Sequence, residues 1–208
     1  MNEWEEKIQQ AIWSARSLFE RGKVSGSAAN LSFLHAGKIY ITASGTCFGR
    51  LTPEDFAVVS LADGTVEGSR KPSKELPLHR MYYLRKPGVT AVIHTHGFYS
   101  VMWSMLSHPD PADVIPDHTP YLKMKLGRVG LVPYAPPGSA ELFAAFEQYL
   151  DGSDGFLLAH HGAVVGGKSV LDAFYALEEL DEAARVAWAV RQSGEPIPEI
   201  DALTGSGK

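Results

Sequence analysis

The sequence predicts an α/β fold, in the form of a three-layer α/β/α sandwich with a mixed, largely antiparallel central sheet. Short apolar runs typical of β-strands alternate along the chain with segments of helical periodicity. Several connections between the expected strands are too short for parallel crossovers. With 208 residues, 45% of them apolar, the chain can bury a sizeable core. We therefore expect a single domain over residues 1–208, with 194–208 as a loosely ordered tail.

The local patterns place the elements in order. An apolar stripe at helical spacing predicts a first helix that ends near Gly22. Ser73 is a suitable N-cap for the next helix, and residues 108–120, rich in Pro and Asp, predict a loop. The last strand is expected to be interrupted around Gly162. The expected strands are residues 38–42, 56–61, 90–96, 129–134 and 156–165, and the later helices are residues 73–85, 98–106, 139–150 and 170–191.

Composition and charge exclude several classes of function. A formal net charge of -5 provides no basic surface for nucleic acid. No apolar stretch approaches the length of a membrane span, and residues 1–7 lack the pattern of a signal peptide. Cys47 is the single cysteine, so an internal disulfide is impossible and a reducing compartment is favoured. We expect a cytoplasmic protein without nucleic-acid or membrane partners.

Histidines end two of the expected strands. His94 and His96 close a buried strand and, two residues apart, emerge on the same face. Burying both imidazoles without a partner is costly, and a shared metal ion removes that cost. His160 and His161 follow the apolar run 155–159, and one of them can join the site because adjacent strand residues face opposite ways. Three neutral imidazoles with one open position form a catalytic type of zinc site.

Small residues predict an anion-binding region near these histidines. Residues 25–27 and 44–46 offer backbone amides and hydroxyls without bulk, as a phosphate group requires. Ser73 lies at an expected helix N-terminus, which favours an anion. Glu75 lies in the first turn of that helix, where a carboxylate is favoured with or without a metal. Loops of this kind beside a metal indicate an anionic or phosphorylated substrate. The other histidines are interpreted as ordinary packed or surface residues: His35, His79, His108 and His118.

Five segments, taken in order, resemble the class II aldolase/adducin family. They are residues 26–32 (GSAANLS), 41–45 (ITASG), 71–75 (KPSKE), 94–96 (HTH) and 161–162 (HG). The similarity extends from about residue 10 to residue 192. Residues 46–49, 72–75 and 119–121 are most similar to the branch that decarboxylates 3-oxo-tetronate 4-phosphates, whereas the L-fuculose-phosphate aldolases share the framework with less similar loops.

The resemblance implies roles for individual residues. His94, His96 and His161 match the family's zinc ligands. Glu75 matches a carboxylate that binds the ion at rest and becomes the acid/base when substrate displaces it. Tyr121 matches a tyrosine that the fuculose-phosphate aldolases place in a neighbouring subunit's site as a proton donor. A homotetramer with sites between subunits is therefore implied.

The resemblance also implies a substrate site. Asn30, Ser44, Gly45 and Ser73 match the phosphate-binding loops. Lys74 departs from the aldolases, which usually carry a second small hydroxyl residue there. A lysine at this position suits a substrate carboxylate or phosphate, and hence a β-keto acid, although it is equally compatible with a solvated surface charge.

The implied activity is that of a zinc-dependent carbon–carbon lyase acting on a phosphorylated sugar or sugar acid through a metal-stabilised enediolate. The favoured reaction is decarboxylation of a 3-oxo-tetronate 4-phosphate to dihydroxyacetone phosphate and CO₂. Three alternatives stay open: an L-fuculose-phosphate-type aldolase, a methylthioribulose-1-phosphate dehydratase, and a non-catalytic adducin-like interaction module. Mn²⁺, Co²⁺ or Fe²⁺ can replace Zn²⁺ at such ligands.

Overall fold

A computed structural model describes residues 2–200, and within them the strands form one eight-stranded sheet in the order β4-β3-β2-β1-β5-β8-β7-β6. Neighbouring strands are antiparallel except for β6 and β7, which are parallel. The predicted mixed, largely antiparallel sheet is therefore confirmed. The strands are β1 (Asn30–His35), β2 (Lys38–Thr42), β3 (Phe56–Ser60), β4 (Val66–Glu67), β5 (Ala91–Thr95), β6 (Val129–Val132), β7 (Gly155–Leu158) and β8 (Gly162–Gly167).

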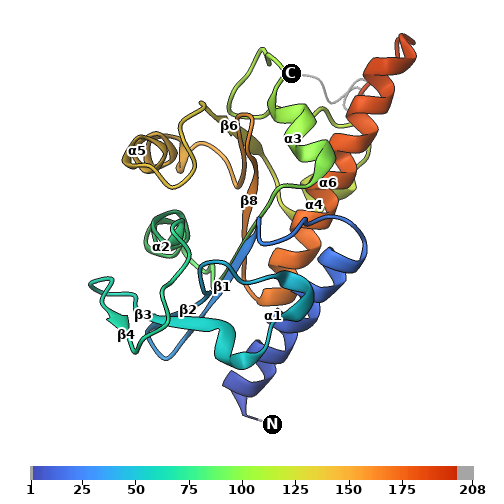
Figure 1. Ribbon diagram of the computed structural model, residues 1–208. Coiled ribbons are helices and arrows are strands. Elements are labelled where there is room, and N and C mark those ends of the chain that lie inside the picture. Colours follow the sequence, from blue (N-terminus) through green and yellow to red (C-terminus); the bar gives the residue numbers. More distant parts are fainter. Residues whose placement is uncertain (1, 201–208) are drawn as a thin grey trace.

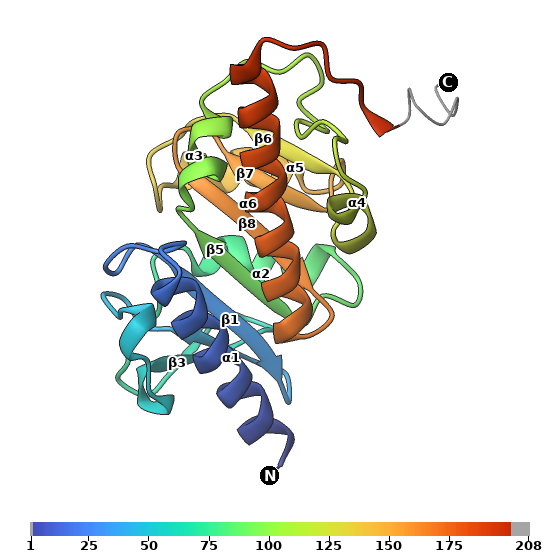
Figure 2. The ribbon, with the colours of Figure 1, turned by 90° about the vertical axis from the view of Figure 1, so that its right-hand side faces the viewer.

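Helices cover both faces of the sheet, which confirms the three layers (Figure 1). The second and fifth helices lie on one face, and the other four lie on the opposite face, where the first and last cross the sheet (Figure 2). The helices are α1 (Glu3–Glu20), α2 (Leu76–Arg85), α3 (Phe98–Ser104), α4 (Tyr121–Lys125), α5 (Ala140–Tyr149) and α6 (Val170–Ser193), with short 3₁₀ turns at Phe48–Arg50 and Pro53–Asp55.

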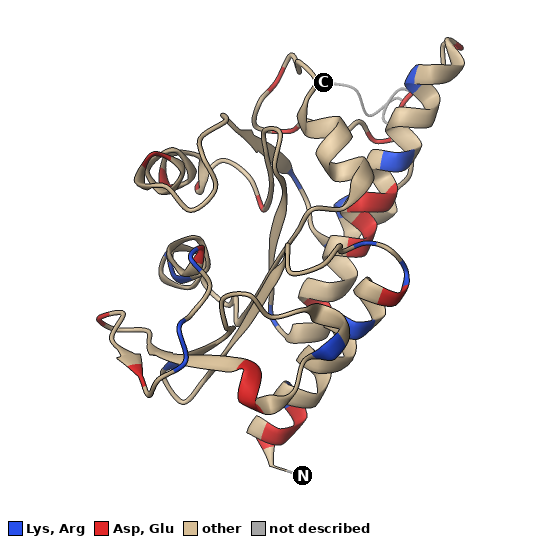
Figure 3. Ribbon diagram, viewed as in Figure 1, with Lys and Arg blue, Asp and Glu red and all other residues tan. Residues whose placement is uncertain are grey.

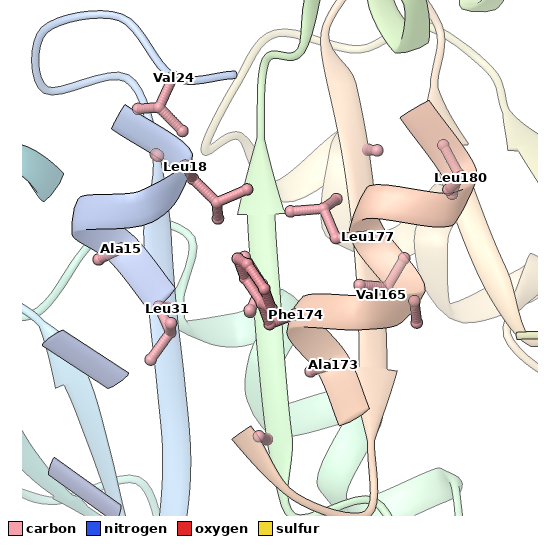
Figure 4. Packing of buried hydrophobic residues seen from close by; sticks show 14 of the residues in the cluster. Ala15, Leu18, Val24, Leu31, Val165, Ala173, Phe174, Leu177 and Leu180 are labelled. Carbon is pink, nitrogen blue, oxygen red and sulfur yellow. The ribbon is translucent and has the colours of Figure 1, made fainter. Parts of the chain in front are cut away.

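Two apolar cores fill the spaces between the layers. On the side of α1 and α6, Leu31 and Val165 of the sheet pack with Leu18 and Phe174 of the helices (Figure 4). On the side of α2 and α5, Val92 packs in a second buried cluster. Burial of the sheet on both faces explains why β5 is an apolar run rather than an alternating one.

The start of α2 differs from the prediction. The helix begins at Leu76 with Glu75 as its N-cap, so the prediction that Ser73 caps it is wrong. Pro77 occupies the first turn, where its missing N–H costs nothing. In a helix capped by Ser73, residue 77 would have to donate a backbone N–H, which proline lacks. Residues 73–75 instead form a turn in which the Ser73 Oγ accepts from the Glu75 N–H at 3.3 Å. The carboxylate of Glu75 is therefore held before the helix, at one end of the central strands.

The expected interruption near Gly162 is a tight turn that separates β7 from β8 and makes them an antiparallel pair. The helix α4, which follows the loop over residues 108–120, was not predicted.

The expected tail lies partly outside the described residues, since 201–208 are not among them. The described part is joined to the loop over residues 108–120, because the Asp117 N–H donates to Glu199 Oε2 at 3.1 Å and the Ile200 N–H to the Asp117 carbonyl at 2.9 Å. Over residues 2–200, the helices are all too short or too polar to cross a membrane.

Candidate metal centre and active site

Three imidazoles meet at one end of the central strands. His94 lies in β5, His96 follows that strand, and His161 lies in the turn just before β8. The ring centroids of every pair are 4.8 Å apart, so the rings form an equal-sided triangle. One ligand nitrogen from each ring lies within 4.8 Å of the other two. The structure thus brings together the three histidines that the sequence singled out.

Glycine at position 162 determines how His161 reaches the triangle. A Cβ atom on Gly162 would lie 2.2 Å from the Thr95 carbonyl oxygen and 2.9 Å from His96 Cδ2, distances that no side chain tolerates. The turn can therefore close against the end of β5 only with glycine there. His160 adopts a positive φ of 57° and its ring faces Tyr134, 6.1 Å away, instead of the triangle. This geometry decides between the adjacent histidines.

The three imidazoles are held in the form that binds a metal. His94 Nδ1 donates to the Ala163 carbonyl at 2.9 Å, which leaves the lone pair on Nε2 directed into the triangle. Burial lowers the pKa of His94 well below its usual value, and it lowers the pKa of His161 as well. Burial, and then the neighbouring His161, lower the pKa of His96 to about 4. All three rings are therefore neutral near pH 7, as metal ligation requires.

Glu75 supplies the only negative charge of the cluster. Its side chain is buried, with Oε2 3.3 Å from His94 Nε2 and Oε1 3.4 Å from His161 Nε2. Oε1 has no hydrogen-bond donor among the described atoms. A buried carboxylate oxygen without a donor is costly, and a cation between it and the imidazoles removes that cost. The residues present therefore fit a divalent ion bound by Glu75, His94, His96 and His161.

A cavity of about 430 Å³ opens beside these groups. Its wall includes residues of the metal cluster and residues of the small-residue loops. Every residue that the sequence analysis assigned to substrate binding lines this cavity. The lining residues are Ser27, Ala28, Ala29, Asn30, Ala43, Ser44, Gly45, Ser73, Lys74, Glu75, His96, Pro137 and His161. A larger cavity of about 570 Å³ lies at the opposite ends of β5 and β8, away from the histidines.

Backbone hydrogen bonds fix the two loops beside each other. The Ser44 N–H donates to the Lys71 carbonyl at 2.9 Å, and the Ser73 N–H donates to the Thr42 carbonyl at 3.3 Å. Gly45 adopts a positive φ of 82°, a conformation that favours glycine. Small side chains and a glycine turn leave room for an anion against the wall of the cavity.

Lys74 brings a positive charge to the cavity. The strands β1, β5, β7 and β8 contain no Lys, Arg, Asp or Glu, so charge at this end comes from connecting segments (Figure 3). Lys74 Nζ donates to the Pro137 carbonyl at 3.1 Å, and the side-chain stem lies close to Gly138, where a Cβ would come within 2.7 Å of it. The ammonium group is therefore held at the rim of the cavity.

Asn30 is engaged by the metal cluster rather than left free. Its Nδ2 donates to Glu75 Oε2 at 2.9 Å, and its Oδ1 lies 2.5 Å from His79 Nε2. One amide hydrogen is left for a ligand in the cavity. His79, interpreted from the sequence as an ordinary packed or surface residue, is completely buried and linked to the cluster. Burial, and then the nearby His94, lower its pKa to about 3.

Tyr121 lies elsewhere in this chain. It begins α4, is 58% exposed and does not border the cavity. In the single chain, the structure therefore does not bring Tyr121 to the other predicted site residues.

Comparison with known proteins identifies a family whose match includes all of the site residues described above. Residues 9–188 match the family described as Class II Aldolase and Adducin N-terminal domain. The chain belongs to the class II aldolase/adducin family. This confirms the resemblance seen in the five ordered segments, and with it a class II aldolase-type lyase that depends on a metal ion.

Similarity to individual relatives indicates which branch of the family this chain resembles most. The chain is 40% identical over 186 residues to the 3-oxo-tetronate 4-phosphate decarboxylase of Escherichia coli K12, covering 86% of this chain and 87% of that protein. It is 33% identical over 179 residues to the L-fuculose phosphate aldolase of Methanococcus maripaludis, covering 86% and 94%. The crystal structure of YgbL from Klebsiella pneumoniae superposes with a TM-score of 0.88 at 35% identity and 97% coverage of both chains. The predicted similarity to the decarboxylase branch is confirmed.

Proposed function

We propose that this chain is a zinc-dependent decarboxylase that converts a 3-oxo-tetronate 4-phosphate into dihydroxyacetone phosphate and CO₂. The observation that carries the proposal is that His96, His161 and Glu75 line the same cavity as Lys74 and the loop at Ser44. The 40% identity to a protein of that activity supports the choice of substrate. Zn²⁺ is the ion we infer from three imidazoles and one carboxylate. A cytoplasmic location, in keeping with the single Cys47, belongs to the same proposal.

The chemistry requires a place for an electron pair. Loss of CO₂ from a 3-oxo acid breaks the bond between C1 and C2 and leaves that pair as an enediolate over C2 and C3. A divalent cation bound by the three imidazoles supplies Lewis acidity, which stabilises negative charge on the substrate's oxygens. The neutral state of His94, His96 and His161 means that these three ligands do not reduce that positive charge.

Glu75 is the residue we assign to proton movement. One proton must be added at C2 to give dihydroxyacetone phosphate, so the reaction consumes one proton and releases one CO₂. The Glu75 carboxyl lies beside the imidazoles at the wall of the cavity, and its Oε1 has no competing donor among the described atoms. It is therefore placed to hold a proton and pass it to a bound substrate.

The cavity wall accounts for the two anionic ends of the substrate. The amides and hydroxyls around Ser44, Gly45 and Ser73 suit the phosphate group. Lys74 suits the carboxylate that will leave or the phosphate, a choice that a substrate lacking one of them distinguishes. Replacing Lys74 by Met is expected to raise the KM of the keto acid phosphate by about 10-fold, the value of one exposed charge-assisted hydrogen bond.

Tyr121 enters the proposal through a neighbouring subunit. Its exposure of 58% on α4 supports a role outside its own chain, and we infer a homotetramer with sites between subunits in which it donates a proton. Sedimentation of the protein, together with activity of Tyr121→Phe mixed with Glu75→Gln, tests this arrangement. Recovered activity in the mixture is expected, because hybrid assemblies contain sites with both native residues.

The test of the reaction is a product analysis in D₂O. The zinc-loaded protein is incubated with a 3-oxo-tetronate 4-phosphate, and the dihydroxyacetone phosphate is examined by NMR. We expect CO₂ release and one deuterium in the hydroxymethyl group, both lost after chelation. Glu75→Gln, which keeps the size of the side chain, should release product far more slowly. Full turnover by this variant with metal bound would remove Glu75 from its role.

An L-fuculose-phosphate-type aldolase is the second candidate, favoured by the 33% identity to an enzyme of that name. Aldol cleavage leaves the same enediolate, so the same groups serve it. Chelator-sensitive deuterium exchange into dihydroxyacetone phosphate is expected for both reactions, and a panel of keto acids and aldols then separates them. Absence of exchange from a metal-loaded protein would count against both and favour the methylthioribulose-1-phosphate dehydratase.

A further inference from the structure

A chain of five buried side chains leads from the interior of the protein to the metal cluster. Tyr83 Oη lies 2.6 Å from Ser32 Oγ, and Ser32 Oγ lies 2.7 Å from His79 Nδ1. His79 Nε2 lies 2.5 Å from Asn30 Oδ1, and Asn30 Nδ2 donates to Glu75 Oε2 at 2.9 Å. All five residues are buried. Each link has hydrogen-bond length, so the chain is continuous.

Local geometry explains why these residues meet. Asn30 and Ser32 are two apart on β1 and therefore point to the same face, toward α2. Glu75, His79 and Tyr83 are each four apart and share one side of the α2 segment. Residues of the strand and the helix alternate along the chain: Asn30 lies between Glu75 and His79, and Ser32 lies between His79 and Tyr83. Asn30 is also the register partner of His94, a member of the metal cluster.

The donors and acceptors fit in one direction only. A carboxylate cannot donate, so the Asn30 amide nitrogen must face Glu75 and its oxygen must face His79. The oxygen needs a donor, which places the hydrogen of the neutral His79 on Nε2. Nδ1 is then an acceptor for the Ser32 hydroxyl, whose oxygen accepts from Tyr83. Reversing any one link would set two donors or two acceptors against each other.

We propose that His79 is a positioning residue of the active site, which orients the Asn30 amide and through it fixes the Glu75 carboxylate toward the metal cluster. The bond from Asn30 holds Glu75 Oε2 beside His94 and turns Oε1, which has no hydrogen-bond donor among the described atoms, toward His161. Ser32 and Tyr83 hold the ring of His79 in the tautomer that this task needs. The inference rests on the proposed metal centre, in which Glu75 is a ligand and moves a proton.

A purely structural role of His79 would not require this chain of polar side chains. A buried apolar side chain of similar volume would fill the space between β1 and α2 without five matched polar groups, and a buried polar group is costly unless every partner is present. The network also points toward the one carboxylate of the cavity rather than closing on itself. Its polarity is therefore explained by the orientation of Glu75.

Two substitutions of His79 separate positioning from packing. In His79→Gln the side-chain amide reaches the location of Nε2 and can still donate to Asn30. In His79→Asn the amide reaches only the location of Nδ1, so the Ser32 link is kept and the Asn30 link is lost.

Zinc affinity is measured by competition with a chromophoric chelator, and kcat and KM are measured separately. His79→Asn should bind zinc about 10-fold to 100-fold more weakly, which is the usual effect of losing a partner of a ligand. It should lower kcat more than it raises KM, whereas His79→Gln should retain most of both.

Tyr82 provides a matched control on the same helix. It is equally buried, but its hydroxyl donates to the Asp154 carbonyl at 2.9 Å and takes no part in the chain. Tyr82→Phe removes one buried hydrogen bond and should lower thermal stability without changing zinc affinity. Tyr83→Phe should lower zinc affinity slightly, because Ser32 can still donate to His79. Equal zinc affinities for the two His79 variants, both folded by circular dichroism, would overturn the proposal.

A spectroscopic measurement tests the same inference without metal or substrate. Long-range ¹H–¹⁵N NMR of the metal-free protein should show His79 with its hydrogen on Nε2 and a bare Nδ1 near pH 7. A hydrogen on Nδ1 contradicts the positioning chain even in an active enzyme. Conversely, if the wild type binds no zinc and turns over no substrate, the proposed function fails, and the NMR result still decides whether His79 orients Asn30.

Discussion

The two faces of β1 lie against different kinds of helix surface. Leu31 and Phe33 point toward α1 and α6 and are 0% exposed in an apolar cluster. Asn30 and Ser32, on the opposite face, point toward α2 and hydrogen-bond to Glu75 and His79. An apolar contact tolerates many partners of suitable volume, whereas a buried polar contact needs particular donors and acceptors. One face of the same strand therefore stabilises the fold, and the other constructs the site.

The largest effect that tests this division is removal of a metal ligand on the polar side. His161→Ala should abolish tight zinc binding and lower kcat by about 1,000-fold, since Lewis-acid stabilisation contributes several kcal/mol. The melting temperature of the metal-free protein should change little. His160→Asn is the matched control, because asparagine tolerates the positive φ at this position and the side chain faces away from the cluster. Loss of zinc from both variants would contradict the assignment of His161.

On the apolar side, the converse result is expected from Leu31→Ala. Removing a completely buried leucine should lower the free energy of unfolding by about 2–5 kcal/mol. Zinc affinity of the folded protein should stay unchanged, because Leu31 faces α1 and not the site. Urea unfolding and chelator competition on the same preparation give both values. Leu31→Met conserves the volume and should cost much less; a fall in zinc affinity with either variant would show that the two faces are coupled.

Gly162 lies where the two functions meet, and its substitution sharpens the comparison. The added methyl of Gly162→Ala would contact the Thr95 carbonyl and the His96 ring, so β8 and His96 must separate. We expect a loss of about 1–3 kcal/mol in unfolding free energy together with weaker zinc binding. At Gly152 the same Cβ atom would lie 3.6 Å from the Tyr149 carbonyl oxygen, an ordinary contact. Gly152→Ala should therefore change neither quantity appreciably.

The smallest expected effect is a pH dependence of the unfolding free energy that arises from His79, on the polar side of β1. His79 titrates near its ordinary pKa of 6.5 when unfolded and at about 3 when folded, because burial disfavours its charged form. The unfolded chain binds a proton first, so stability that is complete above pH 6.5 decreases as the pH falls toward about 3. This one proton contributes a slope of at most about 1.4 kcal/mol per pH unit. Urea unfolding of the metal-free protein between pH 7 and pH 5 should show a flatter slope for His79→Gln than for the wild type; identical slopes would contradict the assignment.

The sequence predicts the architecture because its signals are local. Apolar runs and helical stripes placed the sheet and its two helical layers, and the short connections indicated antiparallel pairing. The start of α2 was placed too early because Ser73 is a good N-cap in isolation, whereas Pro77 determines the real boundary. α4 was missed because it contains only five residues, Tyr121–Lys125, and has no clear periodicity.

The metal cluster was accessible from the sequence, but the groups that support it were less so. His94 and His96 share a strand, so their proximity follows from the period of two. The choice of His161 over His160 depended on the family resemblance, since it is fixed by a turn that closes on Thr95. His79 was dismissed because a lone histidine carries no signal. Its link to Asn30 depends on which face of β1 meets α2, which only the three-dimensional register reveals.

The order of the strands also has a consequence for how the protein acquires its metal. The cluster joins the end of β5 to the turn before β8, and His94 is the register partner of Val164, far along the chain. A growing polypeptide that has emerged only as far as His96 has two of the imidazoles and no tripod. Such long-range pairing forms late in folding, because closing a long loop costs chain entropy before contacts repay it. Tight zinc capture should therefore report that β5 has paired with β8, and the rate of zinc uptake would measure this late step of refolding.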